Sequence, residues 1–232
     1  VVDIIEAGDD CIKTFDIRMV VVDECENESV DTISYFIEVA DNTPPTIACP
    51  PNDLTLECGN PDNASLITGW LNSATAADNC GDATANNNFN AENFSDGCGA
   101  TGTQIVTFWA TDECQNSSTS TCFATVSVLD NTPPTIACPP NDLTLECGDP
   151  ENGALIDTWL ASATAEDNCG SATANNDYDV ENFSDGCGAT GIQTVTFWAT
   201  DECQNSSTST CSMTIEILDT TPPALTCPDN VT

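Results

Sequence analysis

The sequence of 232 residues contains no histidine and only two basic residues, Lys13 and Arg18. The absence of histidine excludes Ser-His-Asp hydrolysis, cysteine–histidine nucleophiles and histidine-ligated zinc. Against the two basic residues stand 38 acidic ones, which gives a formal net charge of −36. Nucleic acids and anionic membranes repel a chain of this charge. We therefore expect its partners to be cations, neutral glycans or other proteins, with no nucleic acid among them.

Long hydrophobic runs are also missing: no stretch approaches the roughly eighteen apolar residues of a membrane-spanning helix, so no membrane insertion is expected. The chain has 15 cysteines but no Cys-x-x-Cys pair of the zinc-binding kind. So many cysteines predict disulfides, and hence a secreted, extracellular or cell-surface protein. The start, Val1-Val2-Asp3-Ile4, shows no basic segment or cleavage signal, so we expect a mature protein or an internal part of one.

An internal repeat dominates the sequence. The tripeptide at 43–45, Thr-Pro-Pro, recurs at 132–134 and 221–223, which sets a period of 89 residues. The two complete copies differ at 21 of these 89 positions and are identical at the remaining 68. This similarity indicates a recent duplication and a tandem array.

The period divides the chain into the last part of one repeat, two complete repeats and the first strand of another: 1–42, 43–131, 132–220 and 221–232. Each complete repeat has six cysteines, and Cys11, Cys25 and Cys227 in the incomplete parts bring the total to 15. We expect these three cysteines to form disulfides with cysteines outside these 232 residues or on a neighbouring chain.

Within a repeat, the local pattern is mostly that of β-strands. Residues 106–111 and 123–129 are rich in β-branched and aromatic side chains, and the loop 112–118 suits an antiparallel hairpin between them. Residues 54–57 alternate as a short strand, and 61–71 have the spacing of one short amphipathic helix. Short strands at close spacing predict an all-β fold of tandem β-sandwiches, in which disulfides supplement a small core.

Four segments in order resemble the hyalin-repeat domain: 41–50 (Asp-Asn-Thr-Pro-Pro-Thr-Ile-Ala-Cys-Pro), 75–80 (Thr-Ala-Ala-Asp-Asn-Cys), 107–116 (Thr-Phe-Trp-Ala-Thr-Asp-Glu-Cys-Gln-Asn) and 122–128 (Cys-Phe-Ala-Thr-Val-Ser-Val). The resemblance covers nearly the whole chain. It implies immunoglobulin-like domains in tandem on extracellular or bacterial cell-surface proteins, a role in adhesion, and no enzymatic activity. Gln115 stands where the family usually has glycine, which bears on the geometry of that hairpin turn.

The resemblance also suggests a disulfide scheme. The family most often retains the pair of opening and closing cysteines, which would be Cys49–Cys122 and Cys138–Cys211. The placement of the loops then suggests one further pair in each repeat and leaves another: Cys80–Cys114 and Cys58–Cys98, with Cys169–Cys203 and Cys147–Cys187 as counterparts. Six cysteines allow fifteen connectivities, so other pairings stay open.

Acidic and amide residues recur in the linkers and loops that we expect at one pole of each complete repeat. They are Asp41, Asn42, Asp78, Asn79, Asp112, Glu113 and Asn116, and then Asp130, Asn131, Asp167, Asn168, Asp201, Glu202 and Asn205. Calcium takes six to eight oxygen ligands, so these clusters are candidate Ca²⁺ sites that would stiffen the joints between domains. The alternative is a solvated acidic surface, because no EF-hand spacing is present.

Seven asparagines stand in glycosylation sequons: Asn27, Asn63, Asn93, Asn116, Asn182, Asn205 and Asn230. In a sequence so rich in Asn, Ser and Thr, chance explains any one of them, and the Ser/Thr runs at 117–121 and 206–210 are alternative O-glycan sites. The recurring tryptophans, Trp70, Trp109, Trp159 and Trp198, are expected in the core rather than in a sugar-binding surface.

These observations favour a structural protein: a stiff, protease-resistant rod or extracellular filament that contacts neighbouring copies of itself. The complete repeats contain neither Lys nor Arg, so trypsin has no site within them. The alternative is an adhesin stalk or binding module that recognises a surface glycan or protein through one divergent repeat. An enzyme is not expected, since a catalytic site is singular whereas these carboxylates recur with the period.

Overall fold

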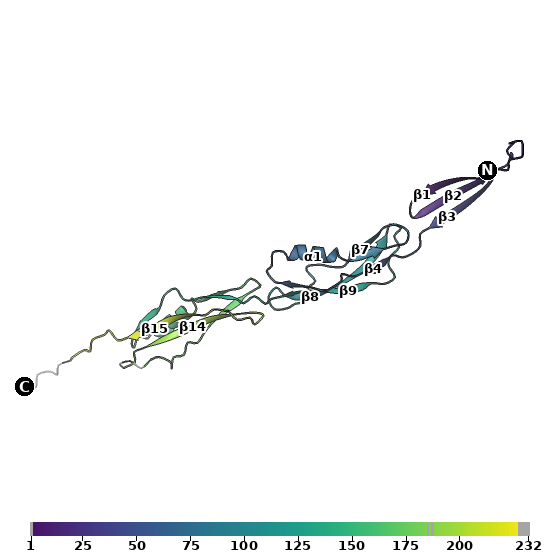
Figure 1. Cartoon of the computed structure of the whole chain (residues 1–232). Helices are drawn as coiled ribbons and strands as arrows, with labels where there is room; N and C mark the ends of the chain where they lie inside the picture. Colours follow the sequence, from purple (N-terminus) through teal and green to yellow (C-terminus); the bar gives the residue numbers. More distant parts are fainter. Residues whose placement is uncertain (1, 185, 187, 227–232) are drawn as a thin grey trace, which may run out of the picture. The chain divides into compact units, whose positions relative to one another are not determined.

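The computed structural model describes residues 2–184, 186 and 188–226 (Figure 1). Its contacts divide the chain into two compact units, and the division does not follow the repeats. Unit 1 contains Val1–Leu56, Asn60–Asp96 and Gly102–Val128; unit 2 contains Glu57–Gly59, Gly97–Thr101 and Leu129–Thr232. Two short segments of the first complete repeat therefore pack with the residues of the second.

The first part of unit 1 is a three-stranded antiparallel sheet. Its strands are β1 (Val2–Gly8), β2 (Ile12–Met19) and β3 (Ile33–Ala40), in that order across the sheet, and Figure 1 shows them side by side. Residues 1–42 thus contain strands alone, without a helix or a second sheet among the described residues. Every residue of β1 and β3 is exposed.

The rest of unit 1 is a small sandwich. A four-stranded sheet has the order β5 (Leu54–Glu57), β9 (Cys122–Leu129), β8 (Gly102–Asp112) and β7 (Ala83–Asn87). A two-stranded sheet pairs β4 (Thr46–Ala48) with β6 (Thr75–Ala77), and α1 (Asn63–Leu71) lies between β5 and β6 in the sequence. The expected strands at 54–57, 106–111 and 123–129 and the expected short helix are all present.

Unit 2 repeats these elements 89 residues further along. They are β10 (Thr135–Ala137), β11 (Leu143–Glu146), α2 (Asn152–Leu160), β12 (Thr164–Glu166), β13 (Ala172–Asn176), β14 (Gly191–Asp201) and β15 (Cys211–Leu218). The large sheet has the order β11-β15-β14-β13, and β11 runs parallel to β15. The prediction of an all-β sandwich with one short helix per complete repeat is confirmed. The further strand expected at 221–232 is not seen in 221–226, and 227–232 lie outside the described residues.

The core of each sandwich lies between the large sheet and the helix. On β8, buried and more exposed positions alternate along all 11 residues, as a strand with one covered face requires. Phe108 on this strand is fully buried and meets Trp70 of α1 edge to face, with ring centroids 5.8 Å apart. Trp159 and Phe197 repeat the contact at 5.6 Å. Trp70 and Trp159 are therefore core residues, as expected, whereas Trp109 and Trp198 are only half-buried.

The opening and closing cysteines form the predicted disulfides. Cys49 is bonded to Cys122 and Cys138 to Cys211, each pair 73 residues apart in the sequence. Each bond joins the small-sheet side of a sandwich to the first residue of its last strand. This part of the scheme is correct because both cysteines border the same core.

The other predicted pairings are wrong where the structure describes them. Cys58–Cys98, Cys80–Cys114 and Cys169–Cys203 do not form; the observed bonds are Cys11–Cys114, Cys58–Cys169 and Cys98–Cys203. Cys25, Cys80 and Cys147 are unpaired among the described cysteines. Cys187, the expected partner of Cys147, lies outside the described residues, as does Cys227.

The error has a physical reason. The scheme assumed that each repeat closes its own disulfides, but the three observed bonds span 111, 105 and 103 residues, each more than one period. Cys58 and Cys98 belong to the two segments that pack in unit 2, so they meet cysteines of the next repeat. Close packing supports this: the Cβ of a side chain on Gly99 would collide with the carbonyl oxygen of Cys169.

We predict that Phe197→Ala lowers the free energy of unfolding of unit 2 by about 3–5 kcal/mol, because it leaves a cavity at a fully buried site. Ile192→Ala on the same strand removes a side chain that is 46% exposed and should have a much smaller effect. Guanidinium denaturation with the disulfides intact measures both. Equal losses for the two variants would contradict the placement of Phe197 in the core.

Candidate functional site

The hairpin turn after the longest strand positions the most buried carboxylate of each sandwich. Asp112, the last residue of β8, is 6% exposed, and its two side-chain oxygens accept hydrogen bonds from the backbone (2.8 Å) and side-chain (2.9 Å) nitrogens of Asn116. Between them, Gln115 has a φ of 67°, in the left-handed region where glycine is usual. Gln115 therefore keeps the turn despite replacing glycine.

The same turn recurs in unit 2 and carries a bond to the linker. Asp201 is 8% exposed and accepts from both nitrogens of Asn205 at 2.9 Å. The side-chain nitrogen of Asn205 also lies 3.2 Å from the backbone oxygen of Asp130, the first residue after β9. In unit 1 Asn116 contacts the backbone oxygen of Asp41 in the same way, at 3.3 Å. The turn thus holds the linker aspartate beside the buried one.

A loop brings a third carboxylate to this place in unit 2. Asp167 follows β12, and one carboxylate oxygen from each of Asp130, Asp167 and Asp201 lies within 4.8 Å of the others. We call these three residues the Asp130 cluster. In unit 1, Asp41 and Asp112 approach each other equally closely, and we call this pair the Asp41 cluster. The sulfur of Cys114 lies beside that pair but is bonded to Cys11, so it is not a free thiolate.

Three aspartates at these places keep a buried oxygen without a partner. One oxygen of Asp167 accepts from the backbone nitrogen of Cys169 at 2.7 Å, but its other oxygen, Oδ1, has no hydrogen bond. Asp78, its counterpart in unit 1, has the same arrangement, and Oδ2 of Asp41 is also unsatisfied. A buried carboxylate oxygen needs a donor or a cation, since leaving it unpaired costs free energy.

The charges in the Asp130 cluster disfavour ionisation. Burial raises the pKa of Asp130, and the neighbouring carboxylates of Asp167, Asp201 and Glu57 raise that pKa further. An aspartate whose pKa is raised on folding destabilises the fold as the pH rises towards neutrality. A bound cation would reverse this effect.

The remaining predicted ligands have other partners. Asn168 donates to the backbone oxygen of Cys58 at 2.9 Å, and Glu202 accepts the backbone N–H of Gly99 at 2.9 Å. Asn131 donates to Glu57 rather than joining the Asp130 cluster. Three residues lie exposed at the edges: Asn42, Asn79 and Glu113. The structure therefore gathers the aspartates and gives the amides mainly structural hydrogen bonds.

Sequence reasoning missed Glu57 and Glu146, which close the first strands of the two large sheets. Glu57 accepts from the backbone nitrogen of Asn131 at 2.8 Å and from the hydroxyl of Thr132 at 2.9 Å. Glu146 does the same with Thr220 and Thr221. These bonds lower the pKa of both glutamates. The sequence feature that could have identified these two glutamates is the repeated Leu-Thr-Leu-Glu-Cys, in which a charged residue ends a short strand.

The asparagines of the sequons lie in different surroundings. The side-chain nitrogens of Asn27, Asn116 and Asn205 each donate to the aspartate four residues earlier, so a glycan there would displace a hydrogen bond. Asn93 and Asn182 are exposed in the loop before the long strand of each sandwich, and the side-chain nitrogen of Asn182 lies 3.5 Å from Asp179 Oδ2. Asn63 opens α1, and Asn230 lies outside the described residues.

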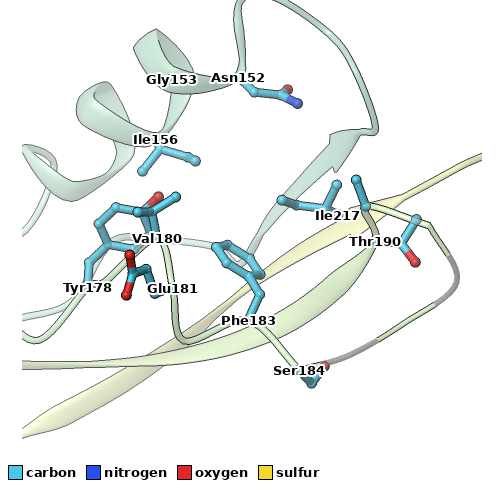
Figure 2. A pocket seen from close by; sticks show the side chains of 11 residues that line it. Asn152, Gly153, Ile156, Tyr178, Val180, Glu181, Phe183, Ser184, Thr190 and Ile217 are labelled. Atoms are coloured by element: carbon cyan, nitrogen blue, oxygen red, sulfur yellow. The ribbon is translucent and has the colours of Figure 1, made fainter.

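A groove of about 650 Å³ lies beside α2 in unit 2. Figure 2 shows the rings of Tyr178 and Phe183 and the side chain of Ile156 along it, with Ile217 on the other side. Glu181 is the one ionisable carboxylate among its lining residues. This lining suits an apolar group and offers no paired carboxylates for glycosidase chemistry.

No family model matches the chain. Two curated relatives are similar in sequence and are named hyalin. That of Lytechinus variegatus is 29% identical over 216 residues, covering 90% of this chain and 38% of the relative. That of Strongylocentrotus purpuratus is 27% identical over 198 residues, covering 83% and 15%. The chain thus spans little more than a third of one relative and a smaller part of the other. These relatives confirm the resemblance to hyalin-type repeats.

Solved structures of cadherin domains are distantly similar. The protocadherin gammaB7 EC3-6 cis-dimer structure has a TM-score of 0.33 and 12% identity, covering 90% of this chain and 58% of that one. Human CDH23 EC21-23 has a TM-score of 0.33 and 12% identity, covering 88% and 74%. TM-scores this low support no further argument.

The five disulfides of the described residues are typical of an oxidising compartment, and the sequence relatives are hyalins. The chain is an extracellular protein, as its cysteine content predicted. Among the described residues, no helix is long and apolar enough to cross a membrane.

We predict that Glu57→Gln lowers the thermal midpoint at pH 7 and that the difference from the unchanged protein shrinks as the pH falls. Because its pKa is lower in the folded state, Glu57 adds stability above the ordinary value of 4.5, and this stability is lost as the pH falls through the folded pKa. Melting curves between pH 7 and pH 3 measure the difference. The control, Glu92→Gln, changes an exposed loop glutamate; an equal effect there would contradict the assignment.

Proposed function

We propose that this chain is part of an extracellular structural protein with an adhesive role, in which disulfide-connected repeats form a stiff rod or filament with Ca²⁺ bound at the linkers. Neighbouring copies of the protein would be its main partners, and no enzymatic activity is proposed. The resemblance to hyalin supports the adhesive part of the proposal.

One observation carries the structural part: disulfides that reach beyond a single repeat. The bonds Cys11–Cys114, Cys58–Cys169 and Cys98–Cys203 each span more than 89 residues, so each connects successive repeats. The linker therefore does not act alone, since disulfides between successive repeats restrict the motions that a flexible tether would allow. Such cross-links favour a load-bearing array over independently moving binding modules.

The Asp130 cluster supports the proposal that calcium is bound. One carboxylate oxygen from each of the three aspartates lies within 4.8 Å of the others, which is no farther apart than two oxygens that each lie about 2.4 Å from one Ca²⁺ ion. Asp130, Asp167 and Asp201 would hold the ion, and waters would complete its shell; in unit 1, Asp41 and Asp112 would hold it. The ion would supply positive charge to carboxylates that otherwise repel one another and to the unsatisfied oxygen of Asp167.

We predict that millimolar Ca²⁺ raises the thermal midpoint of the unchanged protein and that Asp167→Asn weakens Ca²⁺ binding about tenfold or more, or about 1.4 kcal/mol. Asp167 is chosen because its Oδ1 has no other partner. Asp157→Asn removes the same charge from the exposed surface of α2 and should leave the affinity unchanged. Isothermal titration of chelator-treated protein gives the affinities.

Equal affinities in both variants would show a diffuse counterion effect and contradict the site. Electron microscopy of the same samples, with and without chelator, tests the structural role separately. Regular fibres or stiff rods are expected with Ca²⁺. Flexibly jointed particles in both conditions would contradict the proposed rod even if Ca²⁺ binds.

The groove beside α2 favours a second candidate, a binding module for an apolar part of a protein or glycan. The two complete repeats differ most at 60–69 and 88–91, and the counterparts of these segments line the groove. Gly153, Tyr178 and Val180 stand where the first repeat has Ala64, Phe89 and Ala91. A recognition site confined to one repeat requires such a difference.

We predict that Nile red, a neutral apolar dye, binds the chain in this groove. The variant Gly153→Ala/Tyr178→Phe/Val180→Ala, which gives the second repeat the residues of the first, should lose most of the fluorescence increase. The reverse changes at Ala64, Phe89 and Ala91 are the matched control. Unchanged fluorescence in the triple variant would remove the groove as a binding site.

A further inference from the structure

The large sheet of unit 1 has a second face, opposite the core, on which two apolar side chains stand exposed. Along β8 the odd-numbered residues point outward, since the even-numbered ones are buried. Ile105 on β8 is 67% exposed and Phe123 on β9 is 63% exposed. Phe123 lies opposite Thr107, so Ile105 is its diagonal neighbour, within reach of an aromatic ring. The two side chains form one patch on the outward side of β5, β7, β8 and β9, which we call the outer face.

The outer face is free of charge on three of its strands. Residues that lie opposite each other in a sheet share a face, so the registers of β7, β8 and β9 define the outward positions. Besides the two apolar residues, these positions hold a set of threonines together with Asn86, Trp109 and Ser127. None of these residues is ionisable. In a chain with 38 acidic residues, this face is therefore a neutral surface.

The polar groups of the outer face already have partners within unit 1. The side-chain nitrogen of Asn86 donates to the hydroxyl of Thr111 at 2.9 Å and to the backbone oxygen of Thr84 at 3.2 Å. Asp53, at the edge of the sheet, accepts the backbone N–H of Thr125 at 2.8 Å. Burying a polar group costs much less free energy when it keeps its hydrogen bonds. Covering this face would thus remove apolar surface from water at a small cost in polar contacts.

The corresponding face of unit 2 has neither property. Ile105 and Phe123 are replaced there by threonine and serine, and Ser127 is replaced by Glu216. Glu216 lies opposite Ile192, so a carboxylate stands beside the exposed apolar residue of that face. The apolar patch and the lack of charge therefore occur together in one repeat, although the two repeats are identical at most positions.

The charge of the chain limits what can cover the outer face. Two copies with a net charge of −36 each repel one another, so they approach most easily through surfaces without carboxylates. A cationic partner would gain more at the acidic linkers than at a neutral face. A second copy brings the same neutral and apolar surface, and two equal surfaces related by a twofold axis form a closed contact.

We infer that the outer face of unit 1 is a contact surface between two copies of this chain, with Ile105 and Phe123 on its two central strands at the middle of the contact. The two sheets pack face to face, about 10 Å apart, as the sheets of a sandwich do. This inference rests on the proposed association between neighbouring copies and names the surface that provides it. It requires neither Ca²⁺ nor a filament.

The size of the face makes this a weak contact. The four strands contain 4, 8, 11 and 5 residues. At about 3.4 Å per residue and about 4.8 Å between strands, their face covers roughly 450 Å². Two such faces bury roughly 900 Å² together, less than the roughly 1,600 Å² of a standard interface. We therefore expect reversible dimers of low affinity, whose contacts add up where many copies lie side by side.

The test is sedimentation equilibrium of the whole 232-residue chain, with EDTA present and the free thiols blocked by N-ethylmaleimide. Dimers should increase with protein concentration and as NaCl rises from about 0.01 M to about 0.5 M, because salt screens the repulsion between two acidic copies. The variant Ile105→Thr/Phe123→Ser should raise the dissociation constant at least about tenfold. It carries the residues of the second repeat, which the same fold accommodates.

Two further variants separate the face from general effects. Ser127→Glu introduces the carboxylate that the second repeat has at this position, and it should weaken the dimer most at low salt. Phe36→Ser/Ile192→Thr is the matched control, since it makes the same kinds of change at side chains that are 77% and 46% exposed elsewhere. This control should leave the dissociation constant unchanged.

Monomers at every concentration and salt would overturn the proposal. Dimers that persist in Ile105→Thr/Phe123→Ser, or that are lost equally in the control, would place the contact on another surface; the proposed association between copies would then stand without this face. Dimers that dissociate when cellopentaose, a neutral oligosaccharide, is added would identify a glycan as the occupant and also overturn the proposal.

Discussion

The parallel pairing of the first and last strands of the large sheet is the interaction on which the other features depend. It places the end of β5 beside the end of β9, so that Cys58 N–H bonds to Leu129 O at 2.7 Å. From there, the Glu57 carboxylate reaches the linker and Cys58 reaches Cys169. The linker is thereby held by the hydrogen bonds of Glu57, and the neighbouring Cys58 adds a disulfide to the next repeat.

Charge and covalent bonding act in opposite directions at the linkers. Asp130, Asp167 and Asp201 are held close together, and the pKa of Asp130 is raised by burial first and then by repulsion from the neighbouring carboxylates. The disulfides and the Asn205 hydrogen bonds fix the backbone that carries these carboxylates, which prevents them from moving apart. A chain with only two basic residues cannot neutralise the cluster internally. This is why an external cation is central to the proposed function.

The disulfides show how far sequence reasoning extends. Cys49–Cys122 could be predicted because the family resemblance supplies it and both residues border one core. The other pairs could not be predicted. The sequence indicates in which loop a cysteine lies, but it does not indicate which repeat lies against that loop. Cys58 and Cys98 were paired with each other because they remained after the other cysteines of the repeat had been assigned. Their partners were wrong because the segments around them pack with the following repeat.

The sequence by itself determined the period of 89 residues, the strands, the short helix, the extracellular setting and the residue types of the acidic clusters. These features depend on local sequence pattern and composition, which are the same however the chain folds. Only the tertiary structure decided which aspartates lie close together and which cysteines bond across more than one period. It also decided that the carboxylate of Glu57 accepts the hydrogen bonds from the linker, a role that neither Asn42 nor Asn131 has. Such choices depend on which ends of strands lie side by side. That is set by the pairing of β5 with β9 and by the parallel pairing of β11 with β15, in which Leu143 lies opposite Ile215.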